Sequence, residues 1–109
     1  NGAYTAAVLG SGLLNLYPRE NFRLFDDILA HHGALISSFP LTMEPLPHNF
    51  PARNRIISGM SRGCLVVQAA LKSGARITAD FCLAQGRDVF AVPGPFHSPL
   101  SAGCHALIQ

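Results

Sequence analysis

The sequence has few charged residues and no long apolar run, and each of these two shortages excludes a class of protein. Charged residues make up 13% of the 109 positions and hydrophobic residues 49%, a balance that excludes an extended disordered chain. No apolar run approaches the roughly 20 residues that a membrane-spanning helix needs, and no secretory signal is visible. We therefore expect one globular domain over residues 1–109, cytoplasmic and without a membrane partner.

Cysteines are also too few, and too widely spaced, for two common kinds of site. Cys64, Cys82 and Cys104 are odd in number and 18 and 22 residues apart, with no C-x-x-C pair. This pattern indicates neither a disulfide framework nor a zinc site, and a reducing cytoplasm fits it best. We expect no metal and no cofactor.

The first glycine-rich segment lacks what a nucleotide fingerprint requires. Gly10-Ser11-Gly12 follows the apolar run 4–9, but a G-x-G-x-x-G would need a third glycine where Asn15 stands, and a P-loop would need a lysine. Two readings remain. The loop amides approach a phosphate, or the glycines serve a turn that needs positive φ.

The remaining pattern alternates short apolar runs with helical periodicity. Such alternation predicts parallel βαβ units and an open, mostly parallel α/β sheet with helices on both faces, which binds ligands at the carboxyl ends of its strands. In the first helix, we expect Gly33 to provide a left-handed C-cap. The expected strands are 4–9, 34–39, 64–67 and 88–92, and the expected helices are 19–32, 51–63, 73–86 and 100–109.

The segment 50–63 concentrates positive charge before the third strand. Helical spacing puts Arg55 and Arg62 on one outward face, whereas Arg53 shares its side with apolar residues and should be half-buried. Residues 50–109 carry six basic groups against two acids, a net of +4, whereas residues 1–49 carry two against four, a net of −2. The arginine-rich segment indicates a polyanion ligand, and a solvated surface is the alternative.

A second basic segment opens the third helix. Ser73 is a candidate N-cap, and Lys72 and Arg76 flank the first turn. This is either an anion site or an ordinary capped helix with surface charge.

Residue pairs that suggest catalysis have simpler explanations. His31-His32 and Cys104-His105 are adjacent in helices, so their side chains diverge by about 100°. In the first pair, we expect a histidine at the C-terminus of the helix, where its positive charge is favourable. In the second we expect a packed cysteine beside a surface or interface histidine. No paired carboxylates or orienting third group accompany them, and we expect no enzyme activity.

The last expected helix, 100–109, carries an apolar stripe that includes Cys104, Leu107 and Ile108. Such a stripe needs a partner. It packs either on the sheet of its own domain or against a second copy of the chain, with His105 and Ile108 at the interface.

An ordered series of segments resembles the DNA-processing protein A family, also called DprA or Smf. The similarity runs almost end to end. The segments are Gly10-Ser11-Gly12, Tyr17-Pro18-Arg19-Glu20-Asn21, Phe50-Pro51-Ala52-Arg53-Asn54-Arg55-Ile56-Ile57-Ser58-Gly59, Leu65-Val66-Val67, Lys72-Ser73-Gly74, Ile77-Thr78-Ala79, Gln85-Gly86-Arg87-Asp88-Val89-Phe90-Ala91-Val92-Pro93-Gly94 and Ser101-Ala102-Gly103-Cys104-His105.

The resemblance implies a Rossmann-like domain, here its C-terminal portion, from a cytoplasmic protein. It implies binding of single-stranded DNA, a homodimer, protection of incoming DNA and loading of the RecA recombinase in natural transformation. A nucleotide-binding or nucleotide-hydrolysing Rossmann-like enzyme is the alternative, and a pure interaction module is a third class. The DNA-binding residues that the resemblance implies are Gly10, Ser11, Gly12, Phe50, Arg53, Asn54, Arg55, Lys72, Ser73 and Gly74.

Overall fold

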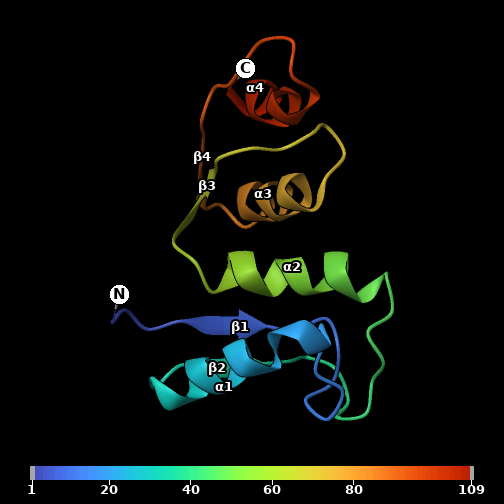
Figure 1. Ribbon diagram of the computed structural model, residues 1–109. Coiled ribbons are helices and arrows are strands. Elements are labelled where there is room, and N and C mark those ends of the chain that lie inside the picture. The colour runs from blue at the N-terminus through green and yellow to red at the C-terminus, as the bar shows by residue number, and fades with distance from the viewer. Residues whose placement is uncertain (1, 109) are drawn as a thin grey trace. The chain divides into compact units, whose positions relative to one another are not determined.

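The computed structural model describes residues 2–108 of the chain (Figure 1). The fold divides into two compact units, Asn1–Arg53 and Asn54–Gln109, and each is described by itself. In each unit two short strands pair in parallel and a helical connection joins them. The predicted α/β class with parallel pairing is therefore confirmed.

The first unit is built on the strand pair β1 (Ala6–Val8) and β2 (Ala34–Ile36). The pairing continues past β1, because the Leu9 amide donates to the Ile36 carbonyl at 2.8 Å. The connection holds a short 3-10 turn, η1 (Arg19–Asn21), followed by α1 (Phe22–Ala30). The strands are shorter than the apolar runs that predicted them.

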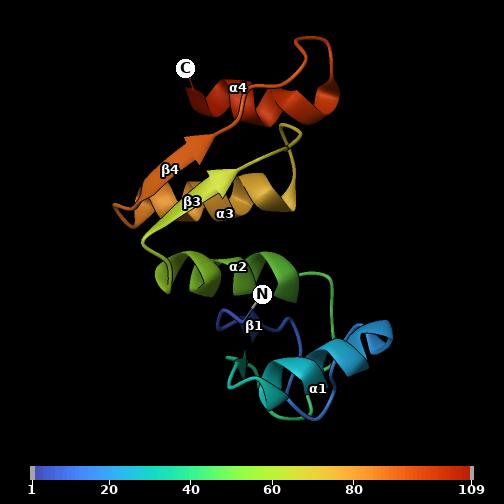
Figure 2. The ribbon, with the colours of Figure 1, turned by 60° about the vertical axis from the view of Figure 1, so that its left-hand side comes forward.

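The second unit pairs β3 (Gly63–Val66) with β4 (Asp88–Ala91), and α3 (Gly74–Ala84) joins them (Figure 2). The chain then forms η2 (Pro99–Ser101) and α4 (Ala102–Ile108). The buried core of the second unit contains Val66, Ala69, Ala79 and Cys104, and Cys64, Val89, Ala91 and Leu107 pack against it.

Helix α2 (Asn49–Gly59) starts in the first unit and ends in the second. Its C-terminal half is held by two side chains from the turn after α3. Gln85 Nε2 donates to the Arg55 carbonyl at 3.2 Å, and the Arg87 guanidinium donates to the Gly59 carbonyl at 2.8 Å. The Arg87 guanidinium thus satisfies the Gly59 carbonyl, one of those that lack an intrahelical partner at the end of a helix.

The predicted left-handed cap at Gly33 is wrong. The residue with positive φ is His32, at 65°, and Gly33 is instead required by space. A Cβ on Gly33 would collide with the Thr5 carbonyl and with Ile28 of α1. The glycine therefore allows the end of α1 to approach the chain just before β1.

The predicted N-cap of α3 is confirmed. The Ser73 hydroxyl accepts a hydrogen bond from the Arg76 amide at 3.2 Å, and Ser73 has extended backbone dihedrals. Among the described residues, no helix has both the length and the apolar character needed to cross a membrane.

Candidate nucleic-acid interface

The Gly10-Ser11-Gly12 loop is buried and packs against other parts of the first unit. A Cβ on Gly10 would lie 2.7 Å from Cδ1 of Phe50, and a Cβ on Gly12 would collide with the Pro40 carbonyl. Neither glycine has positive φ, so the reading that required it is wrong. The loop needs glycine because protein atoms approach its backbone closely.

The hydroxyl of Ser11 stabilises this loop internally. It donates to the Asn15 carbonyl at 2.7 Å, and the Ser11 carbonyl accepts from the Ser37 hydroxyl at 2.7 Å. Ser11 is only 1% exposed. The Ser11 side chain is therefore buried and hydrogen-bonded within the protein.

Arg53 joins the aromatic ring of Phe50 to the end of a strand. Its Nη1 atom donates to the carbonyl of Val8, the last residue of β1, at 2.6 Å. Its guanidinium carbon lies 5.4 Å from the centroid of the Phe50 ring, which is within cation–π range. Burial lowers the pKa of Arg53 from its ordinary value, but an arginine stays charged at neutral pH. The predicted half-burial of Arg53 is confirmed.

Tyr17 extends this aromatic cluster. Its ring centroid lies 6.0 Å from that of Phe50, with the planes tilted by 57°. We call Gly10, Tyr17, Phe50 and Arg53 the Phe50 cluster. Phe50 is half-buried and Tyr17 exposed, so the cluster offers aromatic surface and one cation at the carboxyl end of β1.

In the second unit, Asn54 connects α2 to the start of α3. Asn54 is buried, and its Nδ2 atom donates to the Gly74 carbonyl at 3.3 Å. Ser73 caps α3 and donates to the Ala70 carbonyl at 3.1 Å. The side chains of Asn54 and Ser73 therefore shape the turn that presents Lys72, which is exposed.

A hollow of about 460 Å³ lies at this turn. Its basic residues are Lys72 and Arg76, and Arg76 pairs with Asp80 at 3.1 Å. No heavy atom would lie within 4 Å of a Cβ on Gly74, so the first turn of α3 is open there. Arg55 is exposed on α2, as predicted from its helical face.

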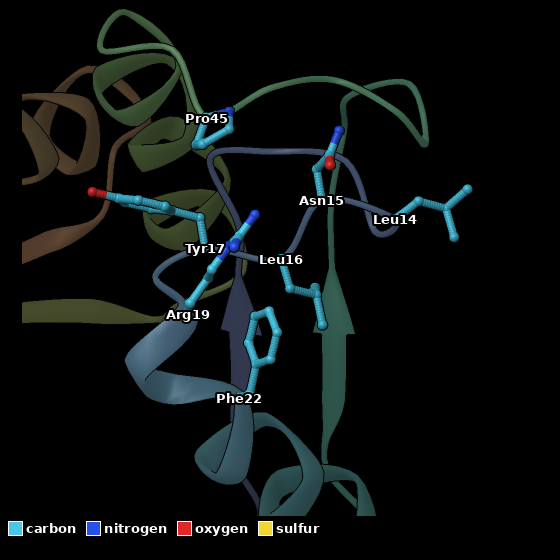
Figure 3. A pocket seen from close by; sticks show the side chains of 7 residues that line it. All are labelled: Leu14, Asn15, Leu16, Tyr17, Arg19, Phe22 and Pro45. Carbon is cyan, nitrogen blue, oxygen red and sulfur yellow. The ribbon is translucent and has the colours of Figure 1, made fainter.

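Sequence reasoning missed a second hollow, of about 270 Å³, in the first unit (Figure 3). Its side chains come from the loop after β1, from the start of the helical connection and from the proline-rich loop. They are Leu14, Asn15, Leu16, Tyr17, Arg19, Phe22 and Pro45. The proximity of Pro45 to Tyr17 was not visible from sequence, because 28 positions separate them.

The Cys104-His105 pair separates as expected. Cys104 is fully buried, and its thiol lies 3.5 Å from the Val66 carbonyl. The His105 Nε2 atom lies 3.3 Å from the Gly94 nitrogen and 3.1 Å from the Gly94 oxygen. Within the described range, no three or more histidine, cysteine or acidic side chains are arranged to hold a metal ion.

The predicted interface residues His105 and Ile108 line a hollow of about 310 Å³ with Pro93 and Phe96. The Phe96 ring stacks on His105 with centroids 6.4 Å apart, and Phe96 is 83% exposed. Cys104 and Leu107 instead pack in the core of the second unit. The apolar stripe of α4 is thus divided between an inner and an outer side.

Comparison with known proteins gives one consistent result. The family model described as "DNA recombination-mediator protein A" matches residues 1–109. Protein Smf of Escherichia coli K12 is 56% identical over 103 residues, which are 94% of this chain and 28% of that protein. The DNA processing protein DprA of Streptococcus pneumoniae is 48% identical over 109 residues, all of this chain and 38% of that protein.

Solved structures agree with the sequence comparisons. The crystal structure of DprA from Streptococcus pneumoniae superimposes with a TM-score of 0.87 at 45% identity, covering 99% of this chain and 38% of that chain. DNA processing protein A from Helicobacter pylori, whose structure addresses a single-stranded DNA binding mode, gives a TM-score of 0.83 at 27% identity, over 95% and 47%. The predicted Rossmann-like fold is confirmed.

Proposed function

Because the chain belongs to the DNA recombination-mediator protein A family, we propose that it binds single-stranded DNA rather than catalysing a reaction. The observation that carries the proposal is the Phe50 ring with the Arg53 guanidinium beside it at the end of β1. An aromatic face stacks on a base of any sequence, and a cation holds the phosphate. We expect little dependence on base sequence.

The other proposed contacts divide by chemistry. Arg55 and Lys72 are exposed cations and would contact phosphate oxygens. Gly74 offers its backbone amide at the open first turn of α3. Asn54 and Ser73 are engaged in hydrogen bonds that shape this turn, and their proposed contribution is to position it.

The Gly10-Ser11-Gly12 loop has a proposed supporting role as well. Because Gly10 admits the Phe50 ring so closely, it sets the position of that ring, whereas Gly12 admits the Pro40 carbonyl and so helps to hold the loop in place. Contacts from this loop to DNA would come from its backbone.

The chain spans about 28% to 38% of the length of the two curated relatives described above. For the whole protein, we propose protection of incoming single-stranded DNA and loading of RecA recombinase in natural transformation, in the cytoplasm. The support is the family resemblance and the DNA-processing names of the relatives.

We also propose a homodimer through the outer side of α4. His105, Ile108 and the exposed Phe96 ring form an apolar and aromatic surface around one hollow. A two-fold interface would set this surface against its own copy.

A single titration tests the DNA proposal. Purified protein is titrated with a single-stranded oligonucleotide, the matching duplex and a mononucleotide at two salt concentrations. We expect the single strand to bind most tightly, with log K falling by about 0.7 per log unit of salt for each phosphate contact. The oligonucleotide recovered afterwards should be intact.

Three results would contradict the proposal in different ways. A preference for duplex, or binding that salt does not affect, would remove the mechanism of stacking and phosphate contact. Hydrolysed nucleotide would favour the enzyme alternative. No nucleic-acid binding by a folded dimer would favour an interaction module.

A further inference from the structure

The hollow beside Tyr17 has a composition that suits one class of ligand. Tyr17 and Phe22 leave 49% and 46% of their surfaces exposed although both rings favour burial, and Leu16 and Pro45 line the same space. Arg19 contributes a guanidinium to this wall (Figure 3). Aromatic faces with one cation match a planar base that carries a phosphate.

Within the described part of the chain, no acidic side chain lines the hollow, so none competes with an anionic ligand for Arg19. Its side chain forms no ion pair with any residue among 2–108, and it is exposed. Arg76, by contrast, is paired with Asp80 at 3.1 Å. An anion that enters the hollow would therefore not have to displace a carboxylate from Arg19.

The size of the hollow and its position beside the Phe50 cluster limit the kind of ligand further. About 270 Å³ lies at the small end of ligand sites, enough for one nucleotide unit rather than a folded segment. Tyr17 belongs to both the hollow and the Phe50 cluster, with the Tyr17 and Phe50 centroids 6.0 Å apart. A strand with one base on Phe50 would bring its next units towards Tyr17.

We propose that this hollow is a second base-stacking subsite, which takes one nucleotide of the strand bound at the Phe50 cluster. Phe22 and Tyr17 contact the base, and Arg19 contacts its phosphate. The subsite rests on the proposed function, because it requires single-stranded DNA as the ligand. It adds residues of the segment 16–22 that the DNA-binding prediction did not include.

The test compares the DNA affinity of substitutions inside the hollow with that of similar substitutions outside it, all within residues 19–24. Phe22→Leu removes the ring but keeps an apolar side chain, and Arg19→Gln removes the charge. Their controls are Leu24→Ala, an exposed apolar residue of α1 outside the hollow, and Arg23→Gln, an exposed arginine next to it. Circular dichroism checks that each variant folds.

We expect Phe22→Leu to weaken binding of a single-stranded oligonucleotide by roughly 5- to 150-fold, the range for one lost stacking contact. Arg19→Gln should reduce the salt slope by about 0.7. Leu24→Ala and Arg23→Gln should bind as the wild type does.

Oligonucleotides with one abasic position, moved along the strand, locate the contact. The wild type should lose affinity at the positions that occupy the two stacking sites, and Phe22→Leu should be insensitive at one of them. Tyr17 adds a direct signal, because the chain has two tyrosines and no tryptophan. In a Tyr4→Phe background, DNA should quench the remaining tyrosine fluorescence.

The outcomes separate the two proposals. If the wild type binds single-stranded DNA and Phe22→Leu and Arg19→Gln bind equally well, the subsite is wrong and the proposed function stands. An equal loss in the control variants would also overturn the subsite, because the effect would then belong to α1 as a whole. If the wild type binds no single-stranded DNA, both proposals fail.

Discussion

A Cβ on residue 10 would lie 2.7 Å from Cδ1 of Phe50, because the Phe50 ring packs directly against the backbone of Gly10. The backbone at residue 10 and the ring at residue 50 thus share one narrow space, 40 positions apart in sequence. Both sides of the contact are stiff, since a main chain and an aromatic ring yield less than a flexible side chain does.

Gly10→Ala should therefore destabilise the protein by about 1–3 kcal/mol, the usual range for overpacking, and weaken DNA binding by moving Phe50. Urea unfolding and a single-strand titration measure the two effects. Gly74→Ala is the stability control, since a Cβ there meets no atom within 4 Å and Gly74 opens a helix. It should unfold no more easily than the wild type, because alanine favours the helix. Equal stability of Gly10→Ala and wild type would show that the ring has room to move.

The two arginines of α2 should separate stability from binding. Arg53→Ala loses the hydrogen bond to the Val8 carbonyl and the contact with Phe50, so we expect a loss of about 1–3 kcal/mol in stability as well as weaker DNA binding. Arg55→Ala should weaken binding at unchanged stability, because its side chain is exposed. Urea unfolding beside a DNA titration gives both numbers. If Arg53→Ala were as stable as the wild type, the hydrogen bond from Arg53 to the Val8 carbonyl would not stabilise the fold.

Helical spacing predicted the different burial of Arg53 and Arg55, because the face of a residue depends only on its position in the helix. The class of fold was predictable for the same reason, since alternating apolar runs are a local signal. The sequence also identified Ser73 as a cap, which acts on an amide three residues away.

The reasons for the glycines were not predictable. At Gly10, Gly12 and Gly33 the requirement is space next to Phe50, Pro40 and Thr5. These neighbours are 40 positions away in the sequence for Gly10 and 28 positions away for Gly12 and for Gly33. The hollow at Tyr17 and Pro45 depends on the same kind of distant contact. Local patterns carry no information about which distant backbone passes a given residue.

Substitutions at Ser73 should distinguish a helix cap from a DNA contact. Ser73→Ala removes the acceptor for the Arg76 amide and should cost about 0.5–2 kcal/mol. Ser73→Asp keeps an acceptor and favours the positive end of the helix, so stability should return. Its added negative charge should still weaken DNA binding, because the phosphate would approach the same turn. Full binding by Ser73→Asp would exclude this turn from the DNA interface.

The Cys64 thiol gives the protein a stability term that depends on pH. Burial, with the neighbouring Cys82 thiol, raises the pKa of Cys64 above its ordinary value of 9.0. The folded thiol keeps its proton at a pH where the unfolded thiol has lost it. This contribution is fully present below pH 9.0 and is lost as the pH rises from there through the folded pKa.

The stability difference between the wild type and Cys64→Ala measures this term, because titrating groups that do not interact with Cys64 cancel in the comparison. We expect the difference to be constant below pH 9 and to shift against the wild type above it. Iodoacetamide should also modify Cys64 more slowly in the folded protein than in urea, because the thiolate is the nucleophile. A stability difference that is the same at pH 8 and pH 10 would contradict the raised pKa.

The outer side of α4 provides the test of the proposed dimer. Ile108 is 56% exposed and Phe96 is 83% exposed, so an Ile108→Arg substitution should leave the core of the second unit intact. If the hollow between them faces its copy across a two-fold axis, the substitution places two cations on that axis. Light scattering should then report half the mass. Affinity for a short oligonucleotide should be unchanged, whereas affinity for a long strand should fall, because two linked sites gain avidity only on a strand that spans both.

Leu83→Arg is the matched control, since Leu83 is 55% exposed on α3 and lines none of the hollows described above. It introduces the same charge on the same kind of residue, so any effect it shares with Ile108→Arg reflects charge rather than an interface. A dimer that survives Ile108→Arg would assign the outer side of α4 to another partner. An Ile108→Arg variant that unfolds, with Leu83→Arg folded, would place Ile108 in the core. A monomer that binds long strands as tightly as the wild-type dimer would separate dimerisation from DNA binding.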